Sequence, residues 1–139
     1  MTDADLSRAC AVVEAYLERS MVLDPEGASS FVGPDLKITF TGGRAFTSPT
    51  ETAAFNAKRY QWVKKRIGTT HAAHDAETDD ICIYNSGNLY GAWPDGTLFD
   101  SNRYIDTFVV RNGLIVATQV WNDSAERLLD MAGLAEAPL

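Results

Sequence analysis

The carboxyl group of Asp106 stands between two aromatic residues in the segment YIDTF and is the first candidate for acid–base chemistry. Side chains of a β-strand alternate between its two faces, so Tyr104, Asp106 and Phe108 share one face. An acid between two rings is paired with a cation, hydrated, or held in an apolar site that raises its pKa. In the last case the carboxylic acid stays protonated at neutral pH and donates a hydrogen bond. An ion pair with Arg103 or Arg44 is the structural alternative.

Three further side chains could take part in such chemistry. Tyr16 lies on the apolar stripe of a predicted N-terminal helix, where a tyrosine is either a core residue or a donor to a ligand. His71 and His74 are the only histidines, and imidazole is the side chain best suited to act as a base near pH 7. Because they are three apart on a predicted strand, at most one faces a cavity, and we favour His71. No carboxylate stands at a metal-ligand spacing to either histidine, so no metal site is expected.

The elements that must position these groups follow from periodicity and turn residues. Asp106 lies in the first of two strands joined by Asn112-Gly113, a dipeptide suited to a type I′ hairpin turn. Strand-like alternation covers residues of about 70–77, 81–93, 97–111 and 114–122, with turn residues between them. A shorter strand, LKITFT, is expected to form a hairpin with Ala45-Phe46.

Helix start signals predict four helices. Thr2 and Asp5 form a capping-box pattern before the first helix, whose apolar stripe ends at Ser20. The others are predicted from Asp24-Pro25 to about Val32, from Ser48-Pro49 to about Ile67, and from about Ser124 to Met131 with Asp123 as cap. A short apolar tail, AGLAEAPL, ends the chain.

The chain is predicted to be one α+β domain over residues 1–139, in which a curved sheet and helices enclose a cavity. Nineteen acidic and twelve basic residues give a net charge of -7, which argues against nucleic acid or a membrane surface as partner. The basic cluster falls in the helical pattern and is interpreted as a solvated helix face with no role; it comprises Lys58, Arg59, Lys64, Lys65 and Arg66.

Cofactors and compartment are predicted from what the sequence lacks. It has no glycine-rich nucleotide loop and no serine or cysteine nucleophile motif, so no cofactor is expected. Cys10 and Cys82 are expected to be reduced thiols, and no signal peptide or membrane span is recognisable. These features favour a cytoplasmic protein.

The order of elements, with the YID strand, the NG turn and the QVWND strand end, resembles the nuclear transport factor 2-like superfamily, and in particular its SnoaL-like and ketosteroid isomerase-like members. The resemblance implies a cone-shaped α+β barrel, with a curved, mainly antiparallel sheet wrapped around three N-terminal helices and an apolar pocket. It also implies a homodimer through the outer face of the sheet, which is unusually apolar here and carries Arg103, Ile105, Thr107, Val109, Gln119 and Trp121.

Ketosteroid isomerases join a helix tyrosine and a protonated aspartic acid into an oxyanion hole, and Tyr16 and Asp106 match those positions. Asn56 matches a supporting tyrosine and Asn122 a pocket aromatic. Phe40 stands where those isomerases carry their catalytic base.

The hairpin around Asn112-Gly113 also resembles phenazine-biosynthesis A/B-type proteins. The matching residues are Asn102, Tyr104, Ile105, Phe108, Asn112, Gly113 and Ile115. In that family an acidic residue, taken to be the catalytic acid, corresponds to Val120. One essential acid–base group of each family is therefore replaced by an apolar residue, Phe40 or Val120.

We therefore expect a cofactor-independent enzyme that isomerises, cyclises or dehydrates a small apolar carbonyl compound. Asp106 and Tyr16 would stabilise an enolate, and the base would be His71 or an unidentified group. Residues expected to contact a small apolar or aromatic ligand are Phe40, Asn56, Tyr60, Leu89, Tyr104, Phe108, Thr118, Val120 and Asn122. The alternative is a non-catalytic ligand-binding or assembly domain on the same fold.

Overall fold

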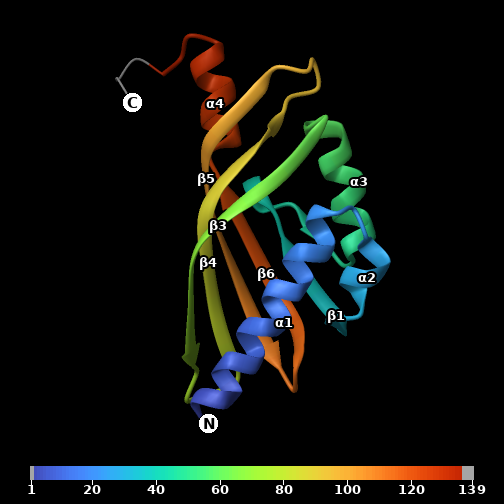
Figure 1. Cartoon of the computed structure of the whole chain (residues 1–139), viewed down its shortest axis with the longest axis vertical. Helices are drawn as coiled ribbons and strands as arrows, with labels where there is room; N and C mark the ends of the chain where they lie inside the picture. Colours follow the sequence, from blue (N-terminus) through green and yellow to red (C-terminus); the bar gives the residue numbers. More distant parts are fainter. Residues whose placement is uncertain (1, 136–139) are drawn as a thin grey trace.

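The computed structural model describes residues 2–135, in which a curved sheet carries helices on its concave side (Figure 1). Met1 and residues 136–139, which include the end of the predicted apolar tail, lie outside the described residues. The helices are α1 (Asp3–Met21), α2 (Pro25–Ser29), the short 3₁₀ helix η1 (Thr41–Gly43), α3 (Pro49–Arg59) and α4 (Ser124–Met131).

Within residues 2–135, six strands form one mixed, mostly antiparallel sheet. They are β1 (Val32–Thr39), β2 (Ala45–Phe46), β3 (Trp62–His74), β4 (Ile81–Ala92), β5 (Leu98–Arg111) and β6 (Leu114–Asn122). Their order is β2-β1-β6-β5-β4-β3, and only the β1–β6 pair is parallel. The α+β class and the mainly antiparallel sheet are thus confirmed.

The predicted caps explain where three of the helices begin. Asp5 N donates to Thr2 Oγ1 at 3.2 Å, and Thr2 N donates to Asp5 Oδ2 at 2.8 Å, which completes the capping box of α1. Glu51 N donates to Ser48 Oγ at 3.2 Å at the start of α3. Asp24 caps α2 through Gly27 N at 2.9 Å.

Two helix predictions need correction at their boundaries. The helix α2 ends at Ser29 rather than near Val32, because β1 already begins at Val32. Asp123 precedes α4 as predicted, but its side chain makes no capping bond. It instead accepts from Arg103 Nε at 2.6 Å, while Ser124 N donates to the side chain of Asn122.

The largest error concerns the residues after α3. This helix ends at Arg59, and residues 62–74 form β3, which pairs with β4 over nearly its whole length. The helical spacing of apolar residues there is overridden by ladder pairing with a neighbouring strand. The basic cluster is therefore divided: Lys58 and Arg59 end the helix, and the other three residues lie on β3.

The hydrophobic core lies between α1 and the concave face of the sheet. Val13 and Leu17 of α1 are buried against strand residues that include Ile38, Ile83, Phe108 and Ile115. Cys10 and Cys82 are free, partly buried thiols. Within residues 2–135, no helix is both long and apolar enough to cross a bilayer.

Candidate functional site

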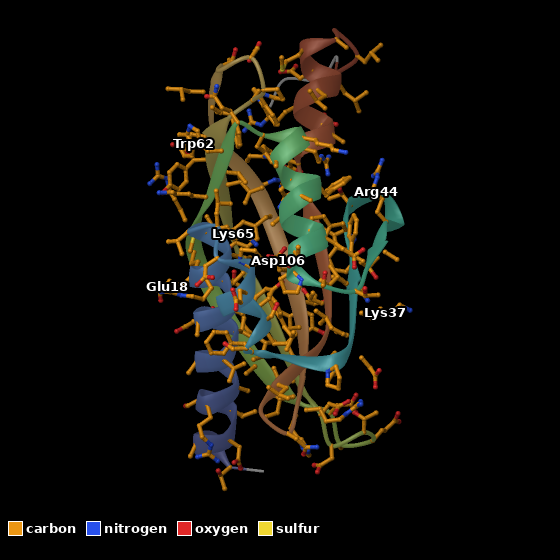
Figure 2. The ribbon with its side chains drawn as sticks, turned by 90° about the vertical axis from the view of Figure 1, so that its right-hand side faces the viewer. Glu18, Lys37, Arg44, Trp62, Lys65 and Asp106 are labelled. Carbon is orange, nitrogen blue, oxygen red and sulfur yellow. The ribbon has the colours of Figure 1, made fainter. Side chains whose placement is uncertain are left out.

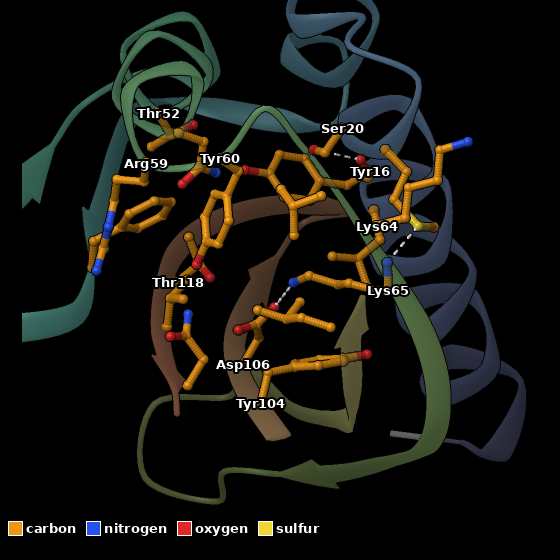
Figure 3. Close-up of a pocket in the computed structure, with 18 of the residues that line it drawn as sticks. Tyr16, Ser20, Thr52, Arg59, Tyr60, Lys64, Lys65, Tyr104, Asp106 and Thr118 are labelled. Atoms are coloured by element: carbon orange, nitrogen blue, oxygen red, sulfur yellow. Dashed lines mark hydrogen bonds and ion pairs between the residues drawn. The ribbon is translucent and has the colours of Figure 1, made fainter. Parts of the chain in front are cut away.

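A pocket of about 120 Å³ lies between the sheet and the helices α1 and α3 (Figure 3). The sequence predicts a cavity enclosed by the sheet and helices. Its walls include Tyr16 and Ser20 of α1, Asn56 of α3, and inward side chains of the sheet. An engineered apolar cavity of roughly 150 Å³ binds benzene, so this pocket matches the size of one six-membered ring.

Asp106 is the buried charge of this pocket. Its side chain is 1% exposed, and it points inward from β5 between Tyr104 and Phe108. Its Oδ2 atom accepts a hydrogen bond from Lys65 Nζ, while Oδ1 has no hydrogen-bond partner among the described residues. Burial raises the pKa of Asp106, although the charge and the hydrogen bond of Lys65 act in the opposite direction.

Lys65 is the cation that the sequence analysis missed. Its side chain is 20% exposed, and Nζ lies 4.5 Å from the centroid of the Tyr104 ring. The arginines considered as partners are engaged elsewhere, since Arg103 pairs with Asp123 and Arg44 donates to the carbonyl of Thr41. Asp106 is therefore ion-paired, but with a lysine from a distant strand.

The register of three strands explains how Lys65 reaches Asp106. Lys65 is opposite Leu89 of β4. Tyr104 is opposite Gly87, which is two residues before Leu89 and therefore on the same, inward face of β4. A Cβ atom at Gly87 would lie 3.1 Å from Tyr104 Cε1 and 2.1 Å from the carbonyl oxygen of Arg66. Glycine at this position thus lets the Tyr104 ring and β3 approach β4 closely, and Lys65 extends over that ring.

A hydrogen-bond chain fixes the Tyr104 ring. The Tyr104 hydroxyl donates to Asn85 Oδ1 at 2.5 Å, and Asn85 Nδ2 donates to Thr70 Oγ1 at 2.9 Å. Asn85 is fully buried on the same inward row as Asp106. Burial and the nearby charge of Asp106 raise the pKa of Tyr104, so its hydroxyl stays a donor.

Tyr16 enters the same pocket from α1. Its ring packs edge-on against Phe108, with 6.0 Å between centroids. Burial and the charge of Asp106 raise the pKa of Tyr16 to about 12, against a smaller opposing effect of Ser20. The Tyr16 phenol is therefore protonated at neutral pH and can donate a hydrogen bond.

A second polar network closes the pocket toward α4. The hydroxyls of Tyr60 and Ser124 share a hydrogen bond of 2.6 Å, and Asn102 Nδ2 donates to Ser124 Oγ at 2.9 Å. Tyr60 also stacks on Trp93 with centroids 5.6 Å apart. This network holds Tyr60 in the pocket wall.

His71 does not line the pocket, so the expectation that it faces the cavity is wrong. Lys65 and His71 are six residues apart and would share a face in a regular strand. A bulge between Ile67 and Thr69 reverses the alternation, so His71 is exposed on the outer face opposite Tyr84. The cationic side chain beside Asp106 is that of Lys65, not that of a histidine.

The structure brings every other predicted site residue to the pocket wall. Besides Tyr16 and Asp106, these are Phe40, Asn56, Tyr60, Leu89, Tyr104, Phe108, Thr118, Val120 and Asn122. Their contact with a substrate stays a prediction. Across residues 2–135, no group of three or more His, Cys, Asp or Glu side chains is arranged to hold a metal ion.

Comparison with known proteins shows likeness in fold and not in sequence. No protein-family model matches the chain, and no curated protein matches it in sequence. Similar solved structures include a nuclear transport factor 2-like protein of Burkholderia thailandensis, with a TM-score of 0.71, 17% identity and coverage of 88% of this chain and 96% of the other.

Two further structures carry functional descriptions. A candidate SnoaL-like polyketide cyclase of Jannaschia sp. CCS1 has a TM-score of 0.66 and 15% identity, covering 95% of this chain and 94% of its own. TerC, crystallised with polyporic acid, has a TM-score of 0.69 and 13% identity, covering 87% of this chain and 95% of its own. The chain therefore has the nuclear transport factor 2-like α+β cone, as predicted.

Proposed function

We propose that this protein is a cofactor-independent enzyme of the isomerase, cyclase or dehydratase type, which moves a proton at the carbon beside the carbonyl group of a small, largely apolar compound. The observation that carries the proposal is the buried pair of Asp106 and Lys65 in the pocket wall, with Asp106 Oδ1 left without a partner. Unpaired buried polar atoms are uncommon, and a catalytic role is one explanation for such an atom when it lines a pocket.

The pair supplies both functions that enolisation requires. In its ionised form, Asp106 Oδ1 accepts the proton from carbon, while the Lys65 ammonium donates to the oxygen of the developing enolate. If Lys65 transfers a proton to Asp106, the carboxylic acid becomes the donor and the Lys65 amine becomes the base. One base and one donor are present in either form.

Tyr16 is the second donor in this scheme. Its raised pKa keeps the hydroxyl protonated, and it lines the same pocket as Asp106. A donor of this kind contributes about 2.7–4 kcal/mol of transition-state stabilisation. The fold shared with a candidate polyketide cyclase and with TerC supports a cyclic or aromatic ligand.

Hydrogen–deuterium exchange at the carbon beside a carbonyl tests the proposal. Cyclohexanone, whose ring suits the pocket, is incubated with the protein in heavy water, and deuteration is followed by NMR. We expect the protein to accelerate exchange and Asp106→Asn to abolish the acceleration. The matched control is Asp35→Asn, because Asp35 is exposed on β1 and outside the pocket. Circular dichroism verifies that both variants fold.

The alternative of a non-catalytic binding domain predicts a different result. In that case, cyclohexanone or a phenol would raise the melting temperature of the protein, but no exchange would exceed the buffer rate. Equal exchange by wild type and Asp106→Asn would also contradict the proposed role of Asp106.

A further inference from the structure

We propose that Lys65 is a covalent catalytic residue, whose side-chain amine condenses with the carbonyl group of an aldehyde or ketone to form an iminium ion. This inference rests on the proposed function, because it concerns the same pocket and the same class of substrate. It adds a bond between protein and substrate that enolisation alone does not need.

The position of Lys65 distinguishes it from the other lysines of the chain. Figure 2 shows Lys65 directed toward Asp106 in the interior, whereas Lys37 lies at the periphery. Lys58 is exposed near the end of α3. Lys64 borders the pocket, but Figure 3 shows its side chain directed away from Asp106. Lys65 alone presents its amine beside a buried carboxylate in the cavity.

A protonated lysine has no lone pair, so a nucleophilic lysine needs a proton acceptor within reach. Asp106 Oδ2 is in contact with Lys65 Nζ and can take that proton. Burial of Asp106 favours its neutral form, which makes the transfer easier than it would be to a solvated carboxylate. The acceptor and the nucleophile are thus already in contact.

The condensation balances with the groups present. The Lys65 ammonium gives one proton to Asp106. The free amine then adds its electron pair to the carbonyl carbon, so that the C–N bond forms while the π bond of the carbonyl breaks and its electron pair moves to oxygen. A proton moves from that nitrogen to the former carbonyl oxygen. Asp106 then returns its proton to the resulting hydroxyl, the C–O bond breaks, and water leaves with that bond's electron pair. The products are the iminium, water and the Asp106 carboxylate, without oxidant or reductant.

The contacts that stabilise the resting Lys65 ammonium also stabilise the iminium product. An iminium carries the same single positive charge, so the neutrality of the pair with Asp106 is preserved. The Tyr104 ring, 4.5 Å from Nζ, offers its face to either cation. The chain through Asn85 and Thr70 holds that ring in place.

Iminium formation would also make the enolisation step easier. The positively charged nitrogen withdraws electrons more strongly than a carbonyl oxygen, so the neighbouring C–H bond becomes more acidic. Asp106, restored to its carboxylate, is placed to accept that proton through Oδ1, which has no competing partner among the described residues. The inference therefore narrows the substrate class to aldehydes and ketones, as opposed to esters and acids.

Reductive trapping tests the bond directly. The protein is treated with cyclohexanone and sodium cyanoborohydride, and its peptides are analysed by mass spectrometry. We expect one cyclohexyl group on the peptide that contains Lys65. Lys65→Arg keeps a cation beside Asp106 but cannot form an imine, so it should lose this adduct. Lys58→Arg, at an exposed position, should retain it.

A second isotope separates this inference from the proposed function. In water labelled with heavy oxygen, reversible iminium formation exchanges the carbonyl oxygen of cyclohexanone, whereas enolisation alone exchanges only hydrogen at the neighbouring carbon. We expect wild type to accelerate oxygen exchange and Lys65→Arg to show only the uncatalysed rate.

The combination of results identifies which claim fails. Deuteration without an adduct and without oxygen exchange would overturn the covalent role and leave the proposed function standing. An adduct with oxygen exchange but no deuteration would support the covalent role and contradict the proposed function. An adduct distributed equally over exposed lysines, or retained at another residue in Lys65→Arg with undiminished oxygen exchange, would also overturn the covalent role.

Discussion

The amine of Lys65 and the carboxylate of Asp106 are in contact although they are 41 residues apart and lie on β3 and β5, which are separated by β4. The lysine crosses the intervening strand above Tyr104, where Gly87 leaves the inward face of β4 without a side chain. A buried carboxylate is costly unless it is paired, so this contact determines both the stability and the chemistry of the pocket.

Replacement of Lys65 by methionine should destabilise the protein in a pH-dependent manner. Without the lysine, desolvation acts unopposed and raises the pKa of Asp106 further above its value in the unfolded chain. Between those two pKa values the folded state binds more protons than the unfolded state, so the free energy of unfolding falls as pH rises. At pH 8 we expect a loss near the lower end of roughly 3–5 kcal/mol, because Lys65 is partly exposed.

Urea denaturation of wild type and Lys65→Met at pH 5 and pH 8 measures this effect. The double variant Lys65→Met/Asp106→Asn removes the titrating group and should abolish the additional pH dependence. A Lys65→Met variant that is more stable relative to wild type at pH 8 than at pH 5 would show that the sign assigned to the pKa of Asp106 is wrong.

A methyl group at Gly87 should disturb the packing where the Lys65 side chain crosses β4. The added Cβ of Gly87→Ala would lie 2.1 Å from the Arg66 carbonyl oxygen and 2.8 Å from Gly68 N, so backbone has to move. Overpacking of this kind typically costs about 1–3 kcal/mol. Chemical denaturation gives the loss, and Gly33→Ala is the control, since its Cβ would have no neighbour closer than 3.4 Å. Equal stability of the two variants would contradict the role given to Gly87.

Local sequence signals were sufficient for β5 and β6. The Asn112-Gly113 turn fixes the hairpin, and the alternation of Tyr104, Asp106 and Phe108 then determines which face they share. The capping residues of α1 and α3 were equally informative, because the hydrogen bonds they make are local. These elements placed Tyr16 and Asp106 in one pocket.

The errors arose where distant contacts decide the structure. Residues 62–67 have helical spacing of apolar side chains, but pairing with β4 makes them a strand, and this hid Lys65 among surface charges. His71 was preferred to His74 without a signal for the face that either occupies, because that face depends on pairing with β4, where His71 is opposite the exposed Tyr84. One signal could have pointed to Lys65: a buried carboxylate such as Asp106 needs a cation, and Arg103 and Arg44 do not pair with it.

Loss of the hydrogen bond between Tyr104 and Asn85 should destabilise the protein. Tyr104→Phe leaves Asn85 Oδ1 buried without its donor, which costs about 1–3 kcal/mol. Tyr90→Phe is the matched control, because the ring contact of Tyr90 with Trp62 does not need the hydroxyl. Thermal or urea denaturation should show a loss for the first variant and almost none for the second. Similar losses in both would mean that the buried hydrogen bond contributes little.

The outer face of the sheet should form a homodimer. Tyr84, Ile105 and Trp121 are 45%, 42% and 48% exposed, and Ile105 is directly opposite Trp121 in the β5–β6 ladder. A stable interface buries roughly 800 Å² per partner, and an exposed apolar sheet face of this kind suits a second copy. Light scattering at micromolar concentration should give a dimer mass, and Ile105→Lys should give a monomer.

The control for this prediction is Val22→Lys, because Val22 is an exposed apolar residue at the end of α1 and away from the sheet. It should remain dimeric. A monomeric wild-type protein would contradict the prediction. If Val22→Lys caused dissociation to the same extent as Ile105→Lys, the interface would include the end of α1.

Removal of the Tyr16 hydroxyl should slow catalysis while leaving the fold intact. Tyr16→Phe keeps the edge-on contact with Phe108, so the free energy of unfolding should change by less than about 1.5 kcal/mol. Loss of a donor to the developing enolate should slow hydrogen–deuterium exchange by roughly 10²–10³-fold. Since the pKa of Tyr16 is about 12, its ionisation should not affect the exchange rate at lower pH, and the variant should keep the shape of the wild-type pH profile. A rate within twofold of wild type would make Tyr16 a packing residue, and a changed pH profile would show that it titrates together with Asp106.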